Sequence, residues 1–266
     1  MSHIIAVANQ KGGVGKTTTA VNLAASLGAM QRRVLLVDLD AQGNATMGLG
    51  VDKDALTISV RDVLLEHAPP VDAVVKLAVD GVSLLPANSD MTEAEIRLRD
   101  MAAGDFALRS ALGSLGDAFD VVLLDCPPAL SKLTVNALVA AHGVLIPMQC
   151  EYYALEGLSA LLDTVDKIKR VVNPELEIEG LLRTMFDPRN NLANDVSAQL
   201  SQHFPDKLYR TIIPRNVRLA EAPSHGTPVM LYDRQSTGAK AYLALAGEFI
   251  RRYRAMEKTT PTRQAL

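Results

Sequence analysis

The sequence predicts an α/β fold in which helices cover both faces of a mostly parallel, twisted sheet. Three observations predict it: short continuous apolar runs recur along the chain, segments with helical periodicity separate them, and a glycine-rich turn follows the first run. At 266 residues and 48% hydrophobic composition, the chain can bury one large core. We expect one domain over residues 1–258 and a disordered tail over residues 259–266, which are mostly polar and include Pro261.

The expected strands are short runs rich in β-branched residues. A parallel strand buried on both faces is apolar throughout rather than alternating, and these runs have that character. They cover residues 4–8, 34–37, 82–85, 121–124, 144–148, 180–185 and 209–213. Ligands bind beyond the carboxyl ends of the strands in such sheets, so functional residues are expected directly after these runs.

The expected helices lie between the strands, at residues 17–27, 92–103, 155–172 and 238–254. Leucine, valine and isoleucine recur at helical spacing in the third segment, which predicts one buried face. Thr92 and Glu95 have the spacing of a capping box, so a helix is expected to begin at Thr92.

Composition excludes several classes of protein. No run approaches the roughly 18 apolar residues that a membrane span needs, and the first residues lack a signal-peptide pattern, so we expect a cytoplasmic protein. The two cysteines, Cys126 and Cys150, lack metal-ligand spacing and do not indicate a disulfide framework. Both are expected to be reduced and internal.

Charge is distributed unevenly along the chain. The formal net charge is −3, yet from Lys207 onward eleven basic residues stand against four acidic ones. A basic face for a polyanion would give this pattern, and so would ordinary solvated helix faces. Charge alone leaves both readings open.

The most informative motif is Lys11-Gly12-Gly13-Val14-Gly15-Lys16-Thr17-Thr18, directly after the first strand. Glycines let the backbone turn and approach an anion closely, and the following helix presents free N–H groups to it. In such a loop the last lysine neutralises the β- and γ-phosphates, and the next hydroxyl binds Mg²⁺. The motif therefore predicts a single-domain P-loop NTPase that binds a nucleoside triphosphate.

Carboxylates follow two other strands. Asp38 and Asp40 end the run at 34–37, and Asp125 ends the run at 121–124. Carboxylates beside a phosphate loop can hold Mg²⁺ through water and position an attacking water. A strand-end aspartate can also cap a helix, but its place next to a phosphate loop favours the functional reading.

The loop departs from the common pattern, since Gln10 occupies the position of the first glycine and Lys11 follows it. This form resembles the deviant Walker A motif of the ParA/MinD group of P-loop ATPases. Residues 36–40 resemble its Walker A′ motif and residues 123–128 its Walker B motif. Residues 149–157 resemble a further signature of chromosomal ParA/Soj proteins. Ala41 stands where many relatives carry proline, a change expected to alter loop stiffness.

The resemblance implies roles for these residues. Lys11 would reach the partner subunit's nucleotide in an ATP-bound homodimer. Catalysis would use Lys11, Lys16 and Asp40, with Asp40 orienting the hydrolytic water. Thr17 and Asp125 would bind the magnesium shell, and Asp38 would support that site.

Later segments resemble the family's base and DNA contacts. Residues 213–218 resemble the loop that closes over adenine, which makes Pro214 and Asn216 candidates for the base pocket. A proline at that point could also simply end a strand. Arg189 and Arg218 resemble DNA-contacting residues. The basic C-terminal helix adds the candidates Arg251, Arg252 and Arg254.

The function implied is a DNA-partition ATPase. Its ATP dimer would hold nucleoid DNA without sequence preference, and a ParB-type partner would stimulate the hydrolysis that releases it. The closest alternative is a MinD-like membrane-positioning ATPase, which needs a C-terminal amphipathic anchor; residues 259–266 are too polar for one. An iron–sulfur carrier or a small-molecule ligase on the same frame is further away.

Overall fold

The computed structural model describes residues 2–259, with side chains through Ala255. The expected tail therefore lies outside the described residues, except Thr259. Within them the strands form one seven-stranded sheet in the order β3-β4-β2-β5-β1-β6-β7, and every neighbouring pair is parallel except β3 with β4. The strands are β1 His3–Val7, β2 Val34–Asp38, β3 Val75–Lys76, β4 Val82–Leu85, β5 Val121–Asp125, β6 Gly143–Met148 and β7 Glu177–Arg183.

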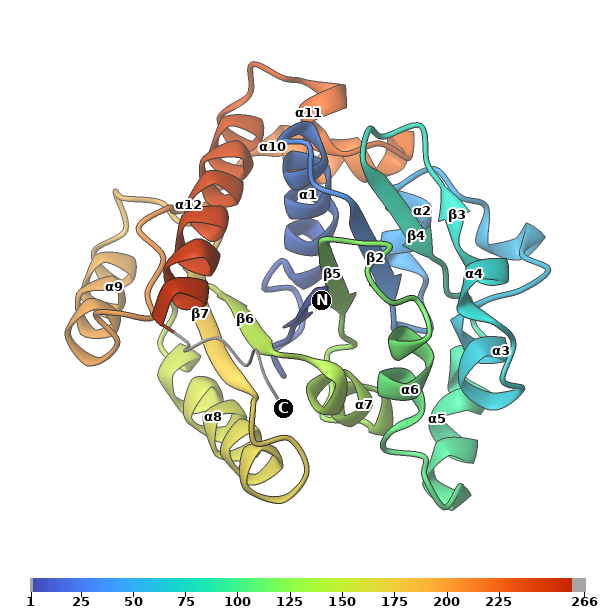
Figure 1. Ribbon diagram of the computed structural model, residues 1–266. Helices are drawn as coiled ribbons and strands as arrows, with labels where there is room; N and C mark the ends of the chain where they lie inside the picture. Colours follow the sequence, from blue (N-terminus) through green and yellow to red (C-terminus); the bar gives the residue numbers. More distant parts are fainter. Residues whose placement is uncertain (1, 260–266) are drawn as a thin grey trace.

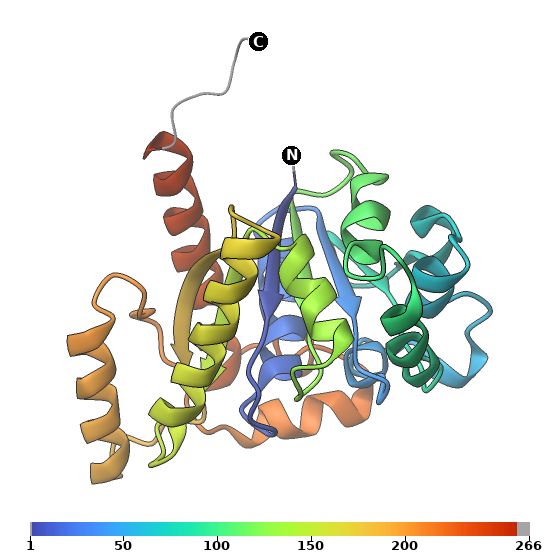
Figure 2. The same cartoon turned by 90° about the horizontal axis from the view of Figure 1, so that it is seen from below.

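Helices cover both faces of this sheet, which confirms the expected fold class (Figures 1 and 2). One face carries α1 Lys16–Ala29, α2 Asn44–Gly48, α10 Val217–Glu221, α11 Val229–Tyr232 and α12 Thr237–Thr259. The other carries α3 Val60–Leu65, α4 Pro70–Ala73, α5 Met91–Asp100, α6 Ala107–Gly113, α7 Lys132–Ala140, α8 Ala154–Val171 and α9 Asn191–His203. Short 3₁₀ turns lie at Lys53–Ala55 and Ala222–His225.

Strand order places the chemistry. Strand β1 lies at the centre, between β5 and β6, so the loop that leaves its carboxyl end is flanked by the loops of both neighbours. Asp38 and Asp125 are paired in register at the ends of β2 and β5. The two sequence-predicted carboxylates thus lie side by side next to the phosphate loop, at one edge of the sheet.

The strand expected at residues 209–213 is wrong. This segment touches the edge of β7 only at its ends: Tyr209 N–H donates to Leu181 O, and Ile213 N–H donates to Arg183 O. Between them, the N–H groups of Arg210 and Thr211 both donate to the carboxylate of Glu248, on α12. A side chain from a distant helix has replaced the ladder partner that a strand would need.

The capping box at Thr92 is also wrong. Helix α5 begins at Met91 after Asp90 and has no side-chain cap. Because Thr92 already lies in the first turn, its hydroxyl does not cap the helix. A capping box does occur at Ser59 and Asp62, where it starts α3. The sequence reading also missed the two-residue edge strand β3, which is too short for a periodic signal.

Candidate functional site

The phosphate loop, residues 9–15, joins β1 to α1. Gly13 and Gly15 have φ angles of +73° and +87°, a conformation that side chains with a Cβ rarely adopt. Gly15 is the N-cap of α1 and supplies no side-chain acceptor, so the first N–H groups of this helix are left for a ligand. The loop therefore has the geometry of an anion site.

Residues far away in the sequence hold the loop in place. Thr184 Oγ1, after β7, donates to Val14 O at 2.7 Å, and Gln149 Nε2, after β6, donates to Gly13 O at 3.3 Å. Asn9 accepts from Lys11 N–H at 3.0 Å and donates to Pro147 O at 2.8 Å. No phosphate-loop pattern includes Asn9 or Thr184, which is why the sequence reading missed both as positioning residues.

Lys16 is buried beneath this loop. Its Nζ donates to Lys11 O at 3.2 Å, so the loop backbone occupies the ammonium group. Burial lowers the pKa of Lys16, and the nearby charge of Asp125 partly opposes that effect. A triphosphate would supply the negative charge that this partly desolvated cation lacks.

The two paired carboxylates differ in what they contact. Asp38 accepts from Thr46 N–H at 2.9 Å, Thr46 Oγ1 at 2.8 Å and Asp40 N–H at 3.1 Å, so both its oxygens are engaged in holding the next loop. Burial raises the pKa of Asp38 to about 6. Both oxygens of Asp125 are buried without a hydrogen-bond partner. Desolvation and then the charge of Asp38 raise the pKa of Asp125 well above its ordinary value.

Asp125 is thus the carboxylate with open coordination capacity. A hard cation at this position would satisfy its orphaned oxygens, and the hydroxyl of Thr17, at the start of α1, lowers its pKa from nearby. Within residues 2–255 no group of three or more His, Cys, Asp or Glu side chains could hold a metal alone. This fits Mg²⁺, which keeps several waters and takes ligands from nucleotide phosphates.

We predict that Asp125→Asn stabilises the nucleotide-free protein by about 0.5–2 kcal/mol near neutral pH while removing Mg²⁺-dependent ATP binding. Below the ordinary aspartate pKa, folded and unfolded chains both hold the proton. As the pH rises towards the raised folded pKa, the unfolded chain ionises freely and the folded one does not, so stability falls. The asparagine variant lacks this fall. Thermal unfolding from pH 4 to 8 measures it, and a variant that is less stable at every pH would contradict the account.

Asp40 and Lys11 lie at the rim of the site. Asp40 is partly exposed and its carboxylate accepts from Gln42 N–H at 3.0 Å, which leaves its other oxygen available. Lys11 forms an ion pair with Glu151, after β6; the side chains are 42% and 49% exposed. Exposed ion pairs contribute about 0–1 kcal/mol, so Lys11 can exchange this partner at small cost.

A cavity of about 390 Å³ lies at the opposite end of the sheet, whereas one of about 320 Å³ adjoins the phosphate loop. The second is lined by Gly15 and Thr18 on one side and by Pro214 and Asn216 on the other. The structure therefore brings both base-pocket candidates to a cavity next to the loop. Asn216 donates to Thr237 Oγ1 at 2.8 Å, which fixes its amide against α12.

The five candidate DNA contacts fall into three groups. Arg189 pairs with Asp187, and Arg218 pairs with Glu221 and Asp233, all at the surface. Arg252 is engaged internally: it pairs with Glu248 and donates to Leu208 O, and its guanidinium lies 4.0 Å from the Tyr209 ring centroid. Arg251 and Arg254 are exposed on α12. Arg252 thus anchors α12, while the other four face solvent.

Both cysteines are free and buried, Cys126 beside Asp125 and Cys150 after β6. Burial raises the pKa of Cys150 to about 11. Thiols in such surroundings are poor nucleophiles and poor metal ligands.

Comparison with known proteins gives the lineage of this site. Residues 2–178 match the family described as "AAA domain". The chain is 48% identical to "Chromosome partitioning protein ParA" of Caulobacter vibrioides over 95% of each chain. It is 50% identical to "Sporulation initiation inhibitor protein Soj" of Bacillus subtilis, over 93% of this chain and 98% of that one. The chain belongs to the ParA/Soj family of partitioning ATPases.

A solved ParA/Soj-like fold carries the nucleotide. The structure of cobyrinic acid a,c-diamide synthase from Mycobacterium smegmatis with bound ADP and magnesium is 39% identical, has a TM-score of 0.85 and covers all of both chains. This protein is accordingly a P-loop ATP hydrolase, with ATP and Mg²⁺ as its cofactors. Among the described residues, no helix is long and apolar enough to cross a membrane.

Proposed function

We propose that this ParA/Soj-family ATPase segregates DNA as an ATP-gated homodimer. The observation that carries the proposal is Lys11, an exposed lysine at the rim of a complete phosphate site, bound only by an exchangeable pair with Glu151. A lysine there can reach a phosphate of a second subunit once the two sites face each other. ATP would then join two subunits whose separate basic surfaces bind DNA together, and hydrolysis would release them.

We predict that Lys11→Gln weakens ATP-dependent dimerisation at least tenfold and slows turnover, although Lys16 still binds the subunit's own nucleotide. The physical reason is the loss of one charge-assisted contact across the interface, worth about 1.5–3 kcal/mol. Sedimentation velocity with ATP measures dimerisation. Glu151→Gln is the matched control, since it removes the intramolecular partner and should leave dimerisation equal or stronger. Normal dimers and turnover in Lys11→Gln would make Lys11 only a surface charge.

DNA binding is proposed through Arg189 and Arg218, with Arg251 and Arg254 on α12. The ion pairs of Arg189 and Arg218 are exposed and therefore weak, so phosphate can displace their carboxylate partners. Arginine contacts to phosphate carry no base information, so unrelated duplexes should bind alike. Such binding places the protein on the nucleoid of the cytoplasm.

We predict that the Arg189→Ala, Arg218→Ala double variant binds duplex DNA more weakly and with a lower salt dependence. Each phosphate contact contributes about 0.9 to the slope of log affinity against log salt. The slope should therefore fall by about 1.8 per subunit. Fluorescence anisotropy with two unrelated duplexes at several salt concentrations gives the slope. Unchanged affinity and slope would remove both arginines from the interface.

A ParB-type, centromere-bound protein is the proposed activator of hydrolysis, by the family membership of this chain. Two alternatives have specific tests. A MinD-like protein would bind anionic vesicles in the presence of ATP, and a diamide synthase would consume ATP only with its carboxylic acid substrate. Binding to duplex DNA but not to vesicles, with ATP turnover raised by a centromere complex, supports partition.

A further inference from the structure

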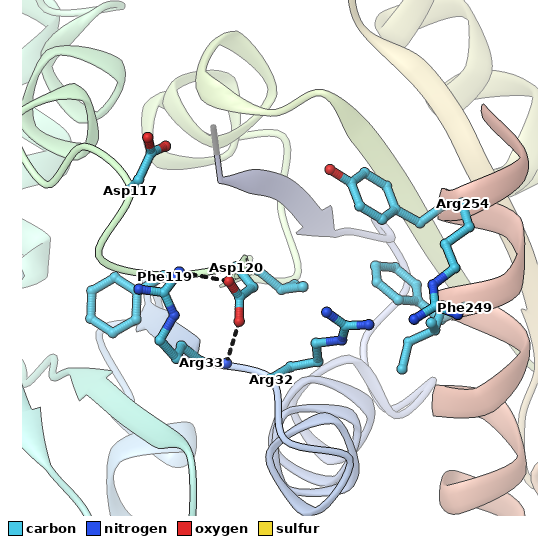
Figure 3. Close-up of a pocket in the computed structure, with 10 residues that line it drawn as sticks. Arg32, Arg33, Asp117, Phe119, Asp120, Phe249 and Arg254 are labelled. Carbon is cyan, nitrogen blue, oxygen red and sulfur yellow. Dashed lines mark hydrogen bonds and ion pairs between the residues drawn. The ribbon is translucent and has the colours of Figure 1, made fainter. Parts of the chain in front are cut away.

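The cavity at the edge of the sheet opposite the phosphate loop is a candidate for a separate contact. It has a volume of about 390 Å³ and lies beneath the start of β5, between the turn after α1 and the last turns of α12. Figure 3 shows its charged residues: Arg32 extends towards α12, where Arg254 and Phe249 lie, while Arg33 turns to Asp120. No motif pointed to this end of the molecule.

Charges in the cavity are unequally satisfied. Arg33 pairs with Asp120 at 2.7 Å, and its N–H donates to the same carboxylate at 2.8 Å. Asp117 also has an interaction partner. Arg32 and Arg254 have no carboxylate partner among the residues that the structure describes. The carboxylates are therefore committed elsewhere, and two guanidinium groups from distant parts of the chain remain for an external anion.

Helix α12 links this cavity to the rest of the basic surface. Lys240, Arg251 and Arg254 are separated by 11 and 3 residues, which at 3.6 residues per turn places them on one side of the helix. All three are exposed, and they span about 21 Å at 1.5 Å per residue. The exposed Ala244 lies on the same side, so a phosphate backbone can approach the helix closely. The stripe ends at the cavity.

We propose that Arg32 and Arg254 together bind one phosphate of duplex DNA and so extend the DNA surface along α12 to the amino-terminal edge of the sheet. This rests on the proposed DNA-binding function. Guanidinium groups donate in a planar fork that suits phosphate oxygens, and two of them at one open cavity suit a single phosphate better than a long acidic segment. Arg32 is the new residue: it follows α1 and has no basic cluster around it in the sequence.

Arg32→Gln, Arg254→Gln and the double variant test the proposal, with Arg99→Gln as the matched control. Arg99 is an arginine on α5 whose side chain is 65% exposed, and its variant removes the same charge far from α12. The readout is the affinity of the ATP-bound protein for duplex DNA across salt concentrations. Thermal unfolding and basal ATP turnover verify that each variant is folded, since Arg32 lies at the edge of the sheet away from the nucleotide.

We expect Arg32→Gln to lower the salt slope by about 0.9 per subunit, or about 1.8 per dimer, while Arg99→Gln leaves it unchanged. Arg32→Lys should restore the slope, because it keeps the charge. The double variant should lose less binding free energy than the two single changes added, because both side chains share one phosphate. Equal slopes in wild type and Arg32→Gln would overturn the inference.

Two further outcomes separate this inference from the function it rests on. If Arg189→Ala, Arg218→Ala weakens DNA binding and Arg32→Gln does not, the inference fails and the DNA function stands. If wild type binds no duplex with ATP, both fail. If titration shows that Arg32→Gln loses binding of inorganic phosphate but keeps its DNA affinity, the cavity takes a small anion, and the proposed DNA contact is overturned.

Discussion

Lys16→Ala should lower the affinity for Mg²⁺-ATP by about 10²- to 10³-fold. Lys16 is buried under the phosphate loop, and its only hydrogen bond is to a loop carbonyl, so the ammonium group is positioned for the β- and γ-phosphates. Truncating one member of a buried, hydrogen-bonded charge pair costs about 2–5 kcal/mol, and 1.4 kcal/mol corresponds to a factor of ten. Isothermal titration with a non-hydrolysable ATP analogue measures the loss.

The variant should remain folded without nucleotide. Burial already lowers the pKa of Lys16, so removing the ammonium group relieves a desolvation cost in the empty site. An unfolding midpoint equal to or above that of wild type would verify this. Lys53→Ala, which removes an exposed lysine that donates to Gln42 O nearby, is the charge-matched control. Wild-type ATP affinity in Lys16→Ala would refute the assignment of the phosphate site.

Asp40→Ala should lower the turnover number by about 10²- to 10⁴-fold and leave ATP affinity within a few-fold of wild type. Correct placement of a proton-accepting or water-orienting group typically contributes that factor to the chemical step. Asp40 makes no contact that shapes the phosphate loop; its carboxylate only accepts from Gln42 N–H. Single-turnover hydrolysis and ATP titration separate the two effects.

A stalled ATP complex should accumulate in this variant as a dimer. Asp38→Ala is the informative comparison. Because Asp38 receives three hydrogen bonds from Thr46 and Asp40, that change should destabilise the loop itself and lower both affinity and stability. Normal hydrolysis by Asp40→Ala would remove this residue from the catalytic role.

The sequence predicted those parts of the fold that local patterns encode. Continuous apolar runs located six of the seven strands in the described chain, and the glycine spacing located the phosphate loop. The segment 209–213 reads as a strand by composition. Its backbone instead satisfies Glu248, a partner 37 and 38 residues away that no local pattern reveals.

Within the site, the sequence identified the loop and its carboxylates but not their division of labour. Asp38 and Asp125 look equivalent as strand-end aspartates. Only the structure shows that Thr46 occupies one of them while the other has orphaned oxygens. Likewise, α12 reads as a basic helix in which Arg251, Arg252 and Arg254 are alike. The ring of Tyr209 and the carbonyl of Leu208 assign Arg252 to the interior.

DNA binding by the wild-type protein with ATP, with ADP and without nucleotide tests the central claim most directly. If ATP joins two basic surfaces, affinity for an arbitrary duplex should be at least tenfold higher with ATP than in the other two states, because pairing two sites raises avidity without a new contact. Asp40→Ala with ATP should bind at least as tightly as wild type and release DNA far more slowly. Equal affinity in all three nucleotide states would contradict the account.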